Sequence, residues 1–247
     1  MVRISEDSRL VDQRVTESIV RLRSIEEIQR RERMRTVLPV VTISRQLGTN
    51  GSETAQKLVE MLGSPWQVWD QQIIDAIANH AEVRKEMVQS LDEHAQGELE
   101  TVVKSLLGVQ VIESPSYHKH LAEVLLTIER AGFAIILGRG ANFLLPRALR
   151  VRLKASMPVR VERIMKQMNM TREQAERTIR ESDKQRTAFI KQMFGQQIDE
   201  EGAYDLVIHT DSLSPEGVAR IIHTAVLVKY PDLEKPSSPV YALVHKR

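Results

Sequence analysis

Short apolar segments alternate with helical patterns from Val40 to about Val228, and this alternation constrains the fold more than any other feature. Five segments are short, rich in apolar or β-branched residues and bounded by turn residues, as buried strands are. They are VVTIS (40–44), WQVW (66–69), FAIILG (133–138), VRLKA (151–155) and YDLVIHT (204–210). Helical patterns cover residues 52–62, 71–80, most of 82–130, 158–168, 172–194 and 214–228, and Thr171 is expected to cap the helix of residues 172–194. Strands separated by helices predict an α/β fold, a parallel sheet of about five strands with helices on both faces.

The composition supports a large folded domain and argues against several classes of protein. Of the 247 residues, 42% are apolar, which is enough for a sizeable core. Because the formal net charge is only +2 and aromatic residues make up 4%, we expect no nucleic-acid binding. The apolar runs are too short to cross a bilayer, and the first residues do not form a secretory signal. Since the chain has no cysteine, it fits a reducing compartment, and we expect a cytoplasmic protein without a membrane partner.

Two terminal segments lie outside this alternation. Residues 8–35 are highly charged and carry apolar residues every three or four positions, which predicts a long amphipathic helix in an extension of residues 1–37. The helix either packs on its own domain or serves as the arm of a homodimer. Residues 231–247 are proline-rich and are expected to lie across the surface as a tail. The α/β domain is therefore expected to span residues 38–230.

The stretch after the first strand, SRQLGTNGS, has the layout of a phosphate-binding loop. Gly48 and Gly51 let the backbone turn its N–H groups inward, and the helix from Ser52 adds the positive end of its dipole. The standard loop GxxxxGK[ST] adds a lysine for the β- and γ-phosphates and a hydroxyl for Mg²⁺. Here Asn50 replaces the last glycine, Gly51 the lysine, and Ser52 occupies the hydroxyl position. These residues, with Thr49, are a candidate phosphate cradle, and an ordinary strand-to-helix turn is the alternative.

Polar residues also follow the second and third strands, at the sheet edge where ligands of such folds bind. Asp70 follows WQVW and is placed either to accept hydrogen bonds from a ligand or to cap the next helix. Arg139 lies between two glycines in GRGAN, after the most apolar strand. A phosphate partner explains an arginine there better than a structural role does.

A basic cluster lies in the middle of the long helical pattern 172–194. Arg180, Lys184 and Arg186 occur in TIRESDKQRTAF, and we expect them on one side of the helix. Arg180 and Lys184 share a face with no carboxylate between them, which favours an anion site. Because Glu181 and Asp183 are interleaved, a solvated, salt-bridged surface is the alternative.

Taken in order, these stretches resemble the bacterial cytidylate kinases, and more closely their divergent cytidylate kinase-like relatives within the P-loop nucleoside monophosphate kinases. The resemblance runs from about Val40 to Val228 and rests on six segments. They are ISRQLGTNGSETAQKL, GSPWQVWDQQII, AIILGRGANFLLP, LKASMPVRVERIMKQM, SDKQRTAFIKQMFG and YDLVIHTDSLSPEGVARII. In these relatives, too, a glycine replaces the loop lysine, and an arginine stands at the position of Arg45.

The resemblance implies transfer of the ATP γ-phosphoryl group to a nucleoside monophosphate, most simply CMP or dCMP, with Mg²⁺. Residues 48–52 would hold the ATP phosphates, with Ser52 as a ligand of Mg²⁺. Arg139 would bind the acceptor phosphate and Asp70 the acceptor's sugar or base, within a helical acceptor region of about residues 71–131. The candidate catalytic residues are Arg45, in place of the lysine, and Lys184 and Arg186 of a lid of about residues 171–200, which Arg180 would assist at the acceptor.

The chain also departs from the cytidylate kinases. Leu137-Gly138-Arg139-Gly140 stands where they have Asp-Gly-Arg-Asp, so both flanking carboxylates are absent. The lid keeps the Asp-x-x-Arg of Asp183 and Arg186 without the preceding Arg-Asp in register. A catalytically weak or inactive nucleotide-binding sensor or interaction protein on the same fold is therefore the alternative function.

Overall fold

The computed structural model describes residues 37–89 and 115–244, together with residues 9, 13, 16, 17, 20, 91, 96, 97, 101 and 103. The predicted helix of residues 8–35 lies outside the described residues except at five positions, all of which are helical. At one of them, Glu17 accepts a hydrogen bond from Nε2 of Gln67, which lies in the sheet of the α/β domain. Its role as a dimerisation arm stays a prediction.

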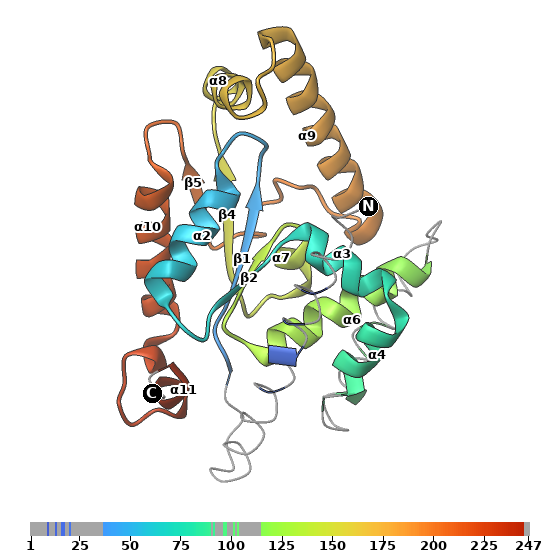
Figure 1. The fold of residues 1–247 in the computed structure, drawn as a ribbon, viewed down its shortest axis with the longest axis vertical. Coiled ribbons are helices and arrows are strands. Elements are labelled where there is room, and N and C mark those ends of the chain that lie inside the picture. Colours follow the sequence, from blue (N-terminus) through green and yellow to red (C-terminus); the bar gives the residue numbers. More distant parts are fainter. Residues whose placement is uncertain are drawn as a thin grey trace.

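The predicted sheet is confirmed: five strands run parallel in the order β2-β3-β1-β4-β5 (Figure 1). The strands are β1 (Val40–Arg45), β2 (Gln67–Trp69), β3 (Ala134–Leu137), β4 (Leu149–Lys154) and β5 (Leu206–His209). Each falls on one of the five apolar segments. Short runs of apolar and β-branched residues between turn residues favour buried strands, because such side chains pack well on a pleated sheet. The three inner strands, β3, β1 and β4, place their carboxyl ends side by side.

Helices cover both faces of this sheet. The described helices are α2 (Gly51–Leu62), α3 (Gln71–Asn79), α4 (Ala81–Gln89), α6 (Pro115–Ala131), α7 (Ala141–Leu144), α8 (Met157–Met168), α9 (Arg172–Phe194), α10 (Pro215–Lys229), the 3-10 helix η1 (Pro231–Leu233) and α11 (Pro239–Val244). Figure 1 shows α2 and α10 on one side of the sheet and α3, α6 and α7 on the other. No helix in the described part of the chain is both long enough and apolar enough to span a membrane.

Alternate residues of each strand enter different cores. Val41 and Ile43 of β1 are buried with side chains of α2 and α10, whereas Val40 packs with side chains of α3 and α6. Ile135 and Ile136 of β3 divide in the same way. Because successive strand side chains point to opposite faces, a sheet covered on both faces needs continuously apolar strands. This explains why the strands read as unbroken apolar runs in the sequence.

Helix α9 extends beside α8 above the carboxyl ends of the strands (Figure 1). It begins at the predicted cap: Thr171 accepts from the N–H of Gln174, whose side chain accepts from the N–H of Thr171. It ends at Gly195, which takes a left-handed φ of 66°. These two signals define a helix of 23 residues, long enough to reach across the sheet edge.

From its prolines, the C-terminal segment is expected to lie across the surface. In the structure, its described part packs against the domain instead. Leu233 of η1 and Val240 of α11 are buried in the core that contains α2 and α10. The hydroxyl of Tyr230 donates to the carbonyl oxygen of Val40 at 2.9 Å, at the start of β1. The segment is therefore a packed part of the domain, because apolar side chains between its prolines find space beside α10.

Candidate functional site

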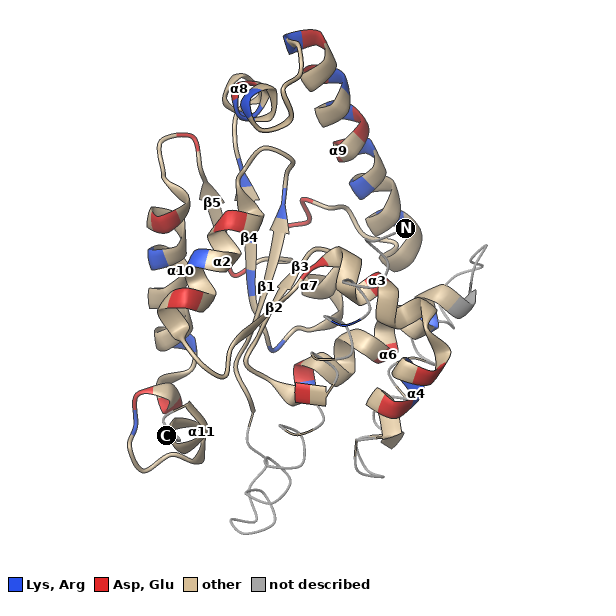
Figure 2. Ribbon diagram, viewed as in Figure 1, with Lys and Arg blue, Asp and Glu red and all other residues tan. Residues whose placement is uncertain are grey.

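A cavity of about 300 Å³ opens at the carboxyl ends of β1 and β3, beneath α9. Among the described residues, its charged lining consists of Arg45, Arg139 and Arg186, and no acidic residue lines it. The other lining residues are Ser44, Gln71, Gly138, Gly140, Ser182, Gln185, Phe189, Ile190 and Ile198. Figure 2 shows basic residues at the carboxyl ends of β1 and β4 and along α9. A cavity lined by one sign of charge raises the local concentration of anions.

The loop between β1 and α2 has the backbone of an anion cradle. Gly48 has a φ of 84°, and Asn50 takes a left-handed conformation of φ 58° and ψ 31° as the N-cap of α2. Asparagine tolerates this conformation better than most residues with a side chain. The Thr49 hydroxyl donates to the carbonyl oxygen of Gln46 at 2.8 Å and closes the turn. Within the described chain, no hydrogen bond from the N–H groups of residues 48–52 is found, as at a helix start that can bind an anion.

Arg45, the last residue of β1, lies beside Gly51, which stands at the position of the standard loop's lysine. A Cβ added at Gly51 would lie 2.9 Å from Arg45 Cγ, and a Cβ at Gly138 would collide with Arg45 Nη1. The arginine side chain therefore lies across two glycines that are far apart in sequence. Burial, and to a lesser extent the charge of Arg186, lower the pKa of Arg45 to about 10. Arg45 thus stays charged at neutral pH, and no ion pair or hydrogen bond of its side chain is found among the described residues.

Arg139 lies at the turn after β3 in a conformation that is rare for a residue with a side chain, with a φ of 55°. Its Nη2 pairs with Asp75 Oδ2 of α3, and its guanidinium lies 5.2 Å from the ring centroid of Phe189 on α9. Tyr117 of α6 donates to Asp75 Oδ1 at 2.7 Å. No sequence motif marks Asp75 as the partner of Arg139, because the two residues are 64 positions apart, or Tyr117 as the partner of Asp75, 42 positions away.

Arg186 is the residue of the basic cluster on α9 that reaches the cavity. Its Nη1 donates to Ser182 Oγ at 2.6 Å, and burial lowers its pKa. Arg180 and Lys184 are exposed and do not line the cavity, so the expectation that the three share one side of the helix is wrong. An α-helix advances about 100° per residue, so residues two apart point in nearly opposite directions. The cavity face of α9 instead carries Ser182, Gln185, Arg186, Phe189 and Ile190.

Asp70 fits the capping alternative. Its Oδ1 accepts from the N–H of Ile73 at 3.0 Å as the N-cap of α3, and Asp70 does not line the cavity. Its charge nevertheless acts on Arg45, since it raises the pKa of that guanidinium against the effect of burial. The neighbouring Gln71 does line the cavity. Ser52 is exposed in the first turn of α2, beside the loop.

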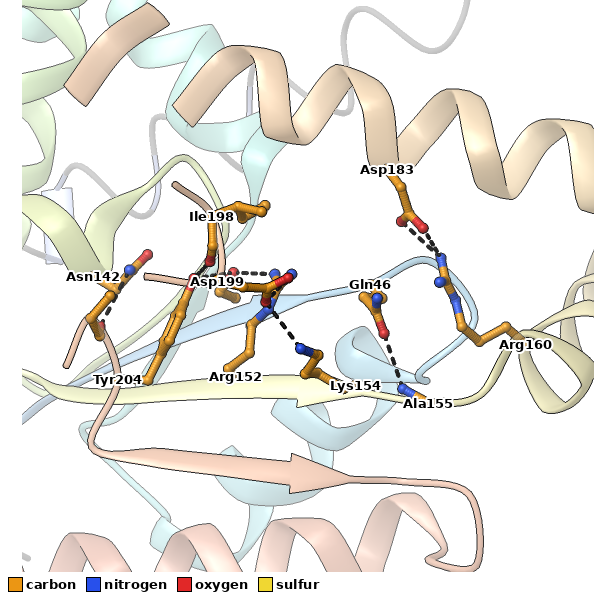
Figure 3. Close-up of polar contacts among 12 residues, drawn as sticks. Gln46, Asn142, Arg152, Lys154, Ala155, Arg160, Asp183, Ile198, Asp199 and Tyr204 are labelled. Atoms are coloured by element: carbon orange, nitrogen blue, oxygen red, sulfur yellow. Dashed lines mark hydrogen bonds and ion pairs between the residues drawn. The ribbon is translucent and has the colours of Figure 1, made fainter. Parts of the chain in front are cut away.

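Arg152, a buried arginine of β4, attaches the segment after α9 to the sheet (Figure 3). Arg152 of β4 donates from Nη1 to Ser44 Oγ at 2.8 Å and pairs with Asp199 at 3.3 Å. Lys154 pairs with the same carboxylate oxygen at 3.3 Å. The Tyr204 hydroxyl donates to the carbonyl oxygen of Ile198 at 2.6 Å, beside Arg152. These contacts hold Ile198 at the cavity wall.

A parallel sheet covered on both faces, with a glycine turn and a basic cavity at its carboxyl edge, defines an α/β protein of the type that binds anionic ligands at that edge. The chain belongs to the cytidylate kinase-like family, whose model matches residues 40–212. This membership supports a nucleotide kinase-like role and confirms the resemblance seen in the sequence.

Curated relatives are similar to the chain at modest identity. The cytidylate kinase of Pyrococcus horikoshii is 34% identical over 98 residues, which span 39% of this chain but only 51% of that protein. The cytidylate kinase of Methanothrix thermoacetophila is 25% identical over 187 residues, which cover 76% of this chain and 97% of that protein. The crystal structure of an uncharacterized protein from Eubacterium ventriosum aligns with a TM-score of 0.51 at 15% identity, covering 76% of this chain and 97% of its own. That structure supports the fold alone.

Proposed function

We propose that this protein transfers the γ-phosphoryl group of ATP to a nucleoside monophosphate, with CMP and dCMP as the first acceptors to test. The observation that carries the proposal is the convergence of Arg45, Arg139 and Arg186 on one cavity, with no acidic side chain among the described residues of its lining. Phosphoryl transfer brings several anionic oxygens together, and its catalysis is mainly positioning and charge neutralisation. The relatives named cytidylate kinase support this choice of acceptor class.

Residues 48–52 are proposed to hold the phosphates of ATP. Their N–H groups have no partner within the described chain, and the start of α2 adds its dipole, so the loop fits a polyphosphate without a lysine. When bound, ATP with Mg²⁺ supplies the transferable group and a cation that offsets charge on its oxygens. Ser52 is proposed as the protein ligand of that Mg²⁺, because Mg²⁺ takes most of its ligands from water and phosphate oxygens and one exposed hydroxyl fits this need.

Arg139 is proposed to bind the phosphate of the acceptor, and the region of about residues 71–131 is proposed to bind the rest of the acceptor. Asp70 caps α3 through Oδ1 and lies outside the cavity lining, so its proposed contact with the acceptor's sugar or base would be made by Oδ2 from beside Gln71, which does line the cavity. Arg45 and Arg186 lie on the other sides of the same cavity and would neutralise charge on the phosphoryl group as it passes. The segment 171–200, which contains α9, acts in this proposal as the lid that excludes water.

The test is a ligand panel with the purified chain. We expect ATP with Mg²⁺ to raise the melting temperature, and CMP or dCMP to raise it further, since ligands that bind only the folded state stabilise it. The same panel, followed by separation of the nucleotides, should show conversion of a monophosphate and ATP to a diphosphate and ADP. Absence of any shift with ATP and with every monophosphate would contradict the proposal.

A nucleotide-binding sensor on the same fold is the second candidate. It is favoured by the loop without a lysine and by the pairing of Arg139 with Asp75, which already satisfies part of the guanidinium. The panel separates the two functions. Clear thermal shifts without turnover on any acceptor would favour the sensor, and turnover would exclude it.

Replacing Asp75 by asparagine is expected to raise the KM for the acceptor roughly tenfold, with a smaller effect on kcat. The change weakens a hydrogen bond to a charged group worth about 1.5 kcal/mol, so that Arg139 loses the contact that orients it. Steady-state kinetics at saturating ATP measures both constants. Tyr117→Phe removes only the support of Asp75 and should have a smaller effect in the same direction. A lower KM in Asp75→Asn would show that Asp75 competes with the acceptor instead.

A further inference from the structure

Helix α8 holds the loop of residues 47–50 along one of its faces. Arg160 Nε donates to the carbonyl oxygen of Leu47 at 2.7 Å, and Arg163 Nη1 donates to that of Gly48 at 3.2 Å. One turn further on, Gln167 Nε2 donates to Asn50 Oδ1 at 2.9 Å. A Cβ at Gly48 would lie 2.9 Å from the carbonyl oxygen of Arg160, so only glycine fits this close approach.

These contacts determine which way the loop's N–H groups point. In a trans peptide unit the C=O of one residue and the N–H of the next point in opposite directions. With the carbonyls of Leu47 and Gly48 held toward α8, the N–H groups of Gly48 and Thr49 point away from it. The cradle is thus oriented by two arginines of a neighbouring helix, in a loop that has no lysine of its own.

The same Arg160 also binds the lid helix. Its Nη2 lies 2.8 Å from both carboxylate oxygens of Asp183 on α9, and Figure 3 shows this pair bridging α8 and α9. The Arg160 side chain is only 4% exposed, and Asp183 is the one carboxylate paired with it among the described residues. If α9 moved away, a buried guanidinium would lose its counter-ion, which is unfavourable.

Asp183 and Arg186 lie three residues apart on α9, so both face the sheet edge. Docking of Asp183 on Arg160 therefore sets the position in which Arg186 enters the cavity. One guanidinium consequently contacts the loop that would hold the donor phosphates and the helix that carries a cavity arginine.

We propose that Arg160 is a positioning residue that couples the phosphate loop to helix α9. Arg160 keeps its contact with Leu47 only while Asp183 is docked, so the loop binds an anion tightly when α9 is docked. By linkage, an anion in the loop stabilises the docked position of α9 to the same extent. The inference rests on the proposed phosphate site at residues 48–52 and names the residues that regulate it.

Two measurements with inorganic tripolyphosphate and with ATP and Mg²⁺ test the coupling in the full chain. Calorimetry gives the affinity, and hydrogen exchange of a peptide covering residues 180–194 reports the docking of α9. In the wild type we expect the ligand to slow exchange in that peptide. In Asp183→Asn we expect at least tenfold weaker binding and an exchange rate of α9 that no longer depends on the ligand.

Matched variants separate coupling from a general loss of stability. Glu181→Gln removes the same charge from an exposed position of the same helix and should behave as wild type. Arg160→Lys keeps the charge but cannot contact both Leu47 and Asp183, so it should behave as Asp183→Asn. The double variant should lose no more affinity than either single variant. If Asp183→Asn binds tripolyphosphate with wild-type affinity and still shows ligand-dependent protection of α9, the coupling is refuted. If the wild type binds neither probe, the proposed phosphate site itself fails, and the coupling fails with it.

Discussion

Arg45→Ala is expected to lower kcat for phosphoryl transfer about 10³-fold, the size of effect seen when a cation is removed from a transferring phosphoryl group. Arg45 is charged at neutral pH, lines the cavity and is not bound to a carboxylate among the described residues. Its charge is therefore available to the substrate. The rate of ADP formation at saturating ATP and acceptor measures the effect, and Arg45→Lys should recover only a part because an ammonium cannot span the same two glycines.

Gly51→Lys provides the sharper control, since it restores the lysine of the standard loop. We expect this variant to be less active than wild type, because a side chain at residue 51 would collide with Arg45 Cγ. Combined with Arg45→Ala, the same lysine loses the 2.9 Å contact with Cγ and keeps only the 3.1 Å contact with Cβ. It should therefore recover about tenfold of the lost activity, as an alternative cation near the phosphates. A Gly51→Lys variant more active than wild type would contradict the assignment of Arg45 to the lysine's role.

Arg139→Ala is expected to lower kcat/KM for the acceptor about 100-fold while leaving the affinity for ATP nearly unchanged. The loss corresponds to about 3 kcal/mol, that of two charge-assisted hydrogen bonds to a phosphate. Arg139 lines the cavity and pairs with Asp75 of α3, whereas residues 48–52 are not among the described residues that line it. Kinetics with the acceptor varied at saturating ATP, together with ATP calorimetry, separates the two effects.

Arg177→Ala is the matched control for Arg139→Ala, since it removes an exposed arginine of α9 and should leave both constants unchanged. Lys184→Ala tests the structural placement directly. Lys184 is exposed on the side of α9 opposite Arg186, so its loss should have little effect. An equal loss of ATP affinity and acceptor use in Arg139→Ala would indicate that Arg139 supports the fold of the whole site.

Local patterns predicted the parts of the site that depend on neighbours in sequence. The glycine turn at residues 48–52, the arginine between two glycines at 139 and the cap at Thr171 are all found where the sequence indicates them. The predicted basic face of α9 is wrong, because Lys184 and Arg186 are close in sequence but about 200° apart around the helix. The apolar Phe189 and Ile190, at helical spacing from Arg186, marked the inward face and were the available signal.

The sequence by itself determined the α/β alternation, the five strands and the backbone of the loop, because strand burial, helix caps and positive φ angles are encoded within a few residues. Only the tertiary structure decided which side chains meet at and around the cavity. It placed Arg45 across Gly51 and Gly138, Asp75 on Arg139, and Arg160 between Leu47 and Asp183. Most of these partners are separated by 23 to more than 110 positions, and parallel strands joined by long crossovers bring them to one edge of the sheet.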